Sequence, residues 1–134
     1  VLNQKVPLLE CLWNDVIFMS AVHPAKVVDA ALRAGLTPSK KWQNRAYFSI
    51  DISKLDWTKL CIYQGVFNNT TKDSNFSWFD ISKIDEYSTL PKDVYKHYEW
   101  VKQNKVYQYF PYAFVPHILY KGTINITKAK IITF

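Results

Sequence analysis

Short apolar runs recur along this chain, and their length constrains its fold more than any other feature. The runs hold four to eight residues and are rich in β-branched and aromatic side chains. Such runs predict β-strands, and none approaches the ~18 residues that a membrane helix needs. We therefore expect no membrane span, and we expect a turn at Lys121-Gly122 that joins two strands of the tail. The predicted strands are residues 16–22, 46–52, 60–67, 114–120, 123–126 and 129–134.

Two segments have helical periodicity instead. In residues 24–34, Pro24 suits the first helical position and Gly35 suits the position just after the helix. Residues 91–103 carry apolar side chains at helical spacing, Tyr98 among them. The balance of segments predicts an α+β fold: a mixed, largely antiparallel sheet of five to six strands with two or three helices.

The chain is basic, with 17 lysines and arginines against 11 acidic residues and a formal net charge of +6. Only Arg33 and Arg45 are arginines, and dispersed lysine is typical of a solvated surface. The tightest basic cluster holds Lys40, Lys41, Trp42 and Arg45. Cations around a tryptophan suit the phosphates and bases of single-stranded nucleic acid, so these four are candidate nucleic-acid-binding residues. A solvated loop is the alternative interpretation.

The cysteines and the first residues of the chain bear on the cellular compartment of the protein. Cys11 and Cys61 have apolar neighbours and no CxxC spacing, which predicts buried free thiols, with a disulfide or a catalytic thiol as alternatives. No signal peptide precedes them, so we expect a cytoplasmic protein. A length of 134 residues predicts one domain over 1–134. The lack of an initiating Met is compatible with a missing N-terminal segment.

Three histidines lie in three separate predicted elements, which is no metal-binding signature, and we expect no metal. His23 lies between a strand and a helix, where it could act as acid or base or bind a loop carbonyl. His117 lies in a strand, and alternation places it on one face with Leu119. With Lys121 to stabilise phosphorane charge, His23 and His117 would suffice for a metal-independent ribonuclease.

Three stretches resemble ADP-ribosyltransferase-like domains, the fold of DNA-modifying toxin transferases and tRNA 2′-phosphotransferases. Residues 14–24 are similar to that family's strand ending in a serine or threonine before a helix. Residues 45–56 resemble its next strand, and residues 115–126 resemble its closing apolar strands. The resemblance covers about a third of the chain and implies a toxin or effector that uses NAD to modify a nucleic acid or a protein.

The resemblance also implies roles for individual residues. Ser20 and Tyr47 would line the nicotinamide cleft, and His117 would stand at the catalytic position. Many members have a glutamate just before the closing strand, where this chain has Pro116 and His117. Residues 1–13 do not match the family's first strand. These departures predict a catalytically degenerate member.

A third hypothesis is a non-catalytic binding protein, either an inhibitor of the immunity type or a nucleic-acid binder. Its support is the aromatic content, because tyrosine and tryptophan anchor protein interfaces at low entropic cost. The densest aromatic stretch holds Tyr107, Tyr109, Phe110, Tyr112 and Phe114. The alternative interpretation of this stretch is core filling beneath a loop.

Overall fold

The computed structural model describes residues 3–37 and 45–133, and it confirms the α+β class. The α-helices are α1 (Pro24–Arg33), the single-turn α3 (Ile84–Tyr87) and α4 (Lys92–Gln103). The strands are β1 (Lys5–Val6), β2 (Cys11–Leu12), β3 (Ile17–Met19), β4 (Tyr47–Ser49), β5 (Leu60–Tyr63), β6 (Phe76–Trp78), β7 (His117–Tyr120) and β8 (Lys130–Ile132). Short 3₁₀ helices lie at Pro7–Leu9, Trp13–Asp15, Ile52–Lys54, Trp57–Lys59, Asp73–Asn75 and Ile81–Lys83.

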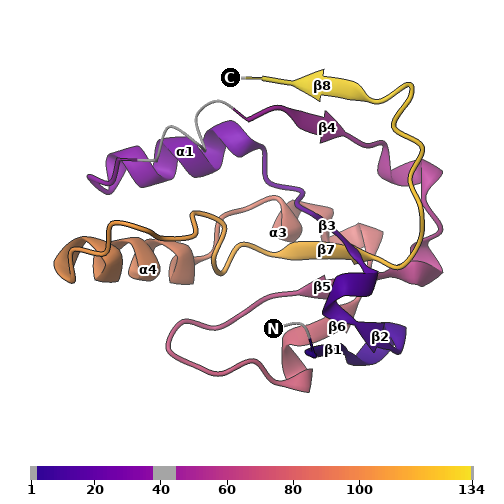
Figure 1. Cartoon of the computed structure of the whole chain (residues 1–134), viewed down its shortest axis with the longest axis horizontal. Helices are drawn as coiled ribbons and strands as arrows, with labels where there is room; N and C mark the ends of the chain where they lie inside the picture. The colour runs from indigo at the N-terminus through magenta and orange to yellow at the C-terminus, as the bar shows by residue number, and fades with distance from the viewer. Residues whose placement is uncertain (1–2, 38–44, 134) are drawn as a thin grey trace.

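The strands form three separate antiparallel sheets instead of one sheet of five to six strands. The largest has four strands in the order β3-β7-β5-β6, while β1 pairs with β2 and β4 pairs with β8. In Figure 1 the β4–β8 pair lies apart from the four-stranded sheet, beyond β3. The sheet is therefore split, and this split positions the candidate site.

The predicted strand at residues 123–126, with its turn at Lys121-Gly122, is wrong. β7 is paired on both sides, with β3 through Ile17↔Tyr120 and with β5 through Leu60↔Tyr120. A following strand therefore has no edge of β7 with which to pair. The chain leaves the sheet after Tyr120 and returns as β8 beside β4.

Local signals place α1 as the sequence predicts. Nδ1 of His23 accepts a hydrogen bond from the Ala25 amide at 3.1 Å, which caps the helix at its N-terminus. Pro24 follows in the first turn. Gly35 has φ +82°, the left-handed conformation that ends a helix and favours glycine. The predicted end signals of α1 are thus confirmed.

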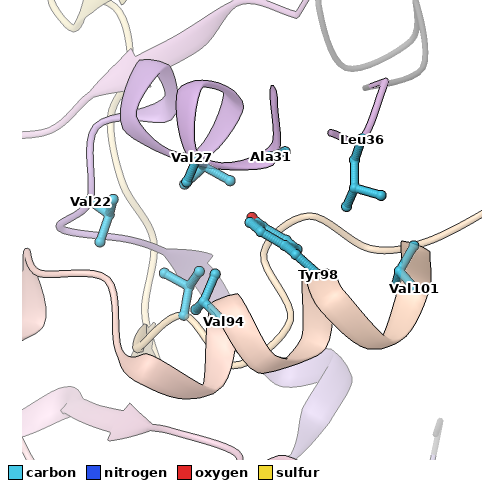
Figure 2. Close-up of a cluster of buried hydrophobic side chains, with 9 residues drawn as sticks. Val22, Val27, Ala31, Leu36, Val94, Tyr98 and Val101 are labelled. Carbon is cyan, nitrogen blue, oxygen red and sulfur yellow. The ribbon is translucent and has the colours of Figure 1, made fainter. Parts of the chain in front are cut away.

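The helices and the sheet enclose three apolar clusters. Figure 2 shows the first, in which Val27 and Ala31 of α1 face Val94, Tyr98 and Val101 of α4. The other two lie on opposite faces of the four-stranded sheet, since Leu119 of β7 belongs to one and Ile118 and Tyr120 belong to the other. The alternation predicted for residues 117–120 is confirmed by this division.

Candidate functional site

A cleft of about 800 Å³ opens between β3 and β4. One wall is the continuous run of residues 17–24, and the other is the continuous run of residues 45–50. Parts of β7, β8 and the segment between α4 and β7 also contribute to the lining. The interior is mostly apolar, with isoleucines from five segments: Ile52, Ile84, Ile118, Ile124, Ile126 and Ile132.

Five of the residues predicted to act in catalysis or in ligand binding line this one cleft. They are Ser20, His23, Arg45, Tyr47 and His117, and they come from three separate segments of the chain. The pairing of β3 with β7 explains part of this gathering. Because Met19 lies opposite Ile118, the same register extended by one position sets Ser20 beside His117. Ser20 Oγ accepts a hydrogen bond from the Val22 amide at 3.0 Å.

The ribonuclease group His23, His117 and Lys121 is not brought together. Lys121 lines a different cavity, and its Nζ donates a hydrogen bond to the Leu9 carbonyl at 2.9 Å. It lies four positions along the extended chain from His117, a spacing of about 13 Å. Lys40, Lys41 and Trp42 fall outside the described residues.

His117 lies in an aromatic environment. Its ring centroid is 6.5 Å from that of Phe18 and 6.3 Å from that of Tyr63. Burial lowers the pKa of His117. The backbone of Val115 raises this pKa, but its effect is smaller than that of burial. Nδ1 is buried without a hydrogen-bond partner among the residues that the structure describes. The environment therefore favours the neutral imidazole, which has no negative charge with which to stabilise a cationic transition state.

His23 is exposed at the rim of the cleft and caps α1, as described above. Its Nδ1 lone pair is used by the Ala25 amide. The partner is thus a backbone N–H, where the sequence suggested a loop carbonyl. Only Nε2 remains for a ligand.

Tyr47 and Tyr112 link two walls of the cleft. Burial raises the pKa of Tyr112, and the neighbouring Tyr47 raises it further, while the nearby Arg45 lowers it. Tyr112 belongs to the segment between α4 and β7, and Phe110 of the same segment also lines the cleft. The sequence marked this aromatic stretch, but its placement at the cleft depends on tertiary contacts.

The cleft has few charged side chains in the part of the chain that the structure describes. No aspartate or glutamate within residues 3–37 and 45–133 lines it, and Arg45 is the cation on its walls. No three metal-binding side chains of the described chain lie close enough together to hold an ion. Nor does any described helix have the length and apolar character to cross a bilayer.

Both cysteines are free, as one of the sequence interpretations predicts. Cys61 is buried at the centre of the sheet, and burial raises its pKa to about 12. Cys11 is only half-buried, which differs from the prediction, and its pKa is also raised by burial. Thiols with raised pKa values are poor nucleophiles at neutral pH.

Comparison of the chain with protein-family models, with curated proteins and with solved structures finds no match in any of the three. The resemblance to ADP-ribosyltransferase-like domains therefore stays a prediction.

Acid should destabilise the fold below about pH 6.5. Burial lowers the pKa of both His97 and His117, whereas histidines of the unfolded chain titrate near 6.5. The unfolded state then binds more protons, so stability is complete above about pH 6.5 and falls as the pH drops through the folded-state values. We expect the melting temperature to fall with pH in this window, and less steeply in His117→Gln. Parallel curves for the two proteins would contradict this expectation.

Proposed function

We propose that this protein binds a segment of a partner polypeptide in the cleft between β3 and β4. The observation that carries the proposal is a set of large apolar side chains that line the cleft yet remain between 36% and 53% exposed. They are Ile17, Phe18, Phe48, Phe110 and Ile126. Such a gathering around one hollow is typical of interaction sites, and aromatic side chains are frequent anchors of protein interfaces.

The electrostatics of the cleft support a binding role. A mostly apolar wall gives affinity, and a few polar groups such as Ser20 and Tyr47 give orientation. Arg45 favours a neutral or acidic partner over a basic one. Among the hypotheses from the sequence, the proposal corresponds to the non-catalytic binding protein of the inhibitor type.

The experiment selects heptapeptides from a displayed library for binding to the whole protein. It then compares the affinities of the selected peptides for two matched variants. Ser49 and Ser77 are both exposed and lie in three-residue strands, but only Ser49 lines the cleft. We expect the tryptophan of Ser49→Trp to fill the cleft and lower the affinity of the selected peptides at least tenfold. Ser77→Trp should leave their affinity unchanged. Equal affinities for the two variants, or no enriched peptide, would overturn the proposal.

A second candidate function, binding of NAD by a degenerate ADP-ribosyltransferase-like domain, is favoured by one observation. Ser20, Tyr47 and His117, the residues that the resemblance assigns to the NAD site, line one cleft together with Arg45. The cleft volume lies within the range of small-ligand sites. Ser20 and Tyr47 would hold the nicotinamide portion and Arg45 the phosphates. No transfer step follows, because no carboxylate of the described chain lines the cleft.

A thermal-shift titration with NAD tests this candidate. A ligand at a hundredfold excess over its Kd stabilises the native state by about 2.7 kcal/mol, which corresponds to a shift of several degrees. We expect Arg45→Gln to reduce such a shift and Arg33→Gln, an exposed arginine of α1, to leave it intact. Absence of a saturable shift at millimolar NAD would exclude this function.

A further inference from the structure

We propose that the partner polypeptide enters the cleft as an extended strand that pairs with the free edge of β3, an inference that rests on the proposed function. The strand would become the fifth of the sheet β3-β7-β5-β6. In the part of the chain that the structure describes, β3 pairs with β7 on one side and with no strand on the other. Alternate residues of an edge strand direct their N–H and C=O groups away from the sheet, which makes the edge a template for another chain.

The lining of the cleft indicates that this edge faces it. A wall made by the face of a strand would contribute every second residue, because neighbouring side chains point to opposite faces. Residues 17–24 instead line the cleft without interruption. The backbone is extended at Val16, with φ −120° and ψ 152°, and through β3, and it bends at Ala21 and Val22 before α1. An incoming chain would therefore find a straight edge along β3 and its immediate neighbours.

The surroundings of β3 define the chemistry of the occupant. Phe18 contacts Trp13 on one face of the sheet, with ring centroids 4.9 Å apart, and Met19 packs into the cluster on the other face. A strand added to β3 would have apolar neighbours on both faces, so it should carry consecutive apolar residues, as fully buried strands do. Five extended residues, about 17 Å, would span the edge. The residue of the incoming strand that lies nearest Arg45 should be neutral or acidic.

The opposite wall limits what else could occupy this position. Residues 45–50 run along the other side of the cleft, and β4 is itself paired with β8 on one side. An occupant between β3 and β4 must therefore satisfy backbone groups along β3 and fill apolar space beside it. A polypeptide supplies donors and acceptors at the two-residue repeat of a strand, which a nucleotide does not.

The test is an N-methyl scan of the tightest heptapeptide selected on the whole protein. Each backbone N–H is replaced in turn by N–CH₃, which removes one donor and adds bulk while the side chains stay the same. We expect binding to fall about tenfold or more at alternate positions and to change little at the positions between them. The same scan on Ser77→Trp serves as the control and should repeat this pattern.

Two outcomes would overturn the inference and leave the proposed function standing. In one, the peptides still lose affinity for Ser49→Trp, but the loss of binding in the N-methyl scan shows no two-residue period. The other is equal tolerance of N-methylation at every position, which would indicate recognition by side chains alone. If no peptide is enriched, or if Ser49→Trp binds as well as Ser77→Trp, the proposed function fails first and this inference fails with it.

Discussion

Replacing Tyr98 with alanine should lower the free energy of unfolding by about 3–5 kcal/mol, the range for removing a large aromatic side chain from a core. Tyr98 is fully buried between α1 and α4 (Figure 2), and its hydroxyl donates a hydrogen bond to the Pro111 carbonyl at 2.7 Å. The side chain thus fills the helix interface and also anchors the segment that carries Phe110 and Tyr112 to the cleft. Urea unfolding followed by circular dichroism would measure the loss.

Two variants separate these contributions. Tyr95, on the same helix, is 49% exposed, so Tyr95→Ala should cost no more than about 1 kcal/mol. Tyr98→Phe keeps the ring but leaves the buried Pro111 carbonyl without its donor, for which we expect about 1–3 kcal/mol. A Tyr98→Ala protein as stable as Tyr95→Ala would show that the packing of α1 on α4 is not as described.

Replacing Leu119 with alanine should cost about 2–5 kcal/mol, because a cavity would open in the middle of the central sheet. Leu119 is fully buried on β7 and lies opposite Phe18 of β3 and Cys61 of β5. Little around it can move to close the cavity, since both neighbouring strands are held by their ladders. The midpoint of urea unfolding should fall while the slope stays unchanged.

The matched control is Leu32→Ala on α1. Leu32 is 51% exposed, so the same change of side chain should alter stability by less than about 1 kcal/mol. A Leu119→Ala protein whose midpoint equals that of Leu32→Ala would contradict the full burial of Leu119 in the cluster on this face of the sheet.

Local signals predicted the fold where they were strong and independent of distant residues. The start of α1 at Pro24 and its end at Gly35 depend on backbone conformations that only a few residue types favour, and both are confirmed. The strand predicted at residues 123–126 failed for the opposite reason. Its apolar pattern fits a strand, but pairing requires a free edge, and β3 and β5 already occupy both edges of β7.

The candidate site was predictable only in part. Alternation and resemblance singled out Ser20, Tyr47 and His117, and the register of β3 on β7 explains why two of them meet. The second wall depends on the pairing of β4 with β8, and no pattern within residues 45–50 indicates which distant strand will join them. The exposed Phe48 and Phe110 resemble core residues in the sequence, because composition does not distinguish a buried aromatic side chain from an exposed one.

The position of β7 at the centre of the sheet also determines how the molecule can assemble. Ile17 of β3 and Leu60 of β5 both pair with Tyr120 of β7, so a strand near the front of the described chain and one near its middle must wait for a strand near its end. Closing so long a loop before any contact is gained makes folding slow, on the order of milliseconds to seconds for sheets of this kind. Until β7 arrives, β3 and β5 present apolar edges to neighbouring molecules. Self-association during expression is thus a hazard of the strand order itself, and raising the temperature or the protein concentration before folding is complete should increase it.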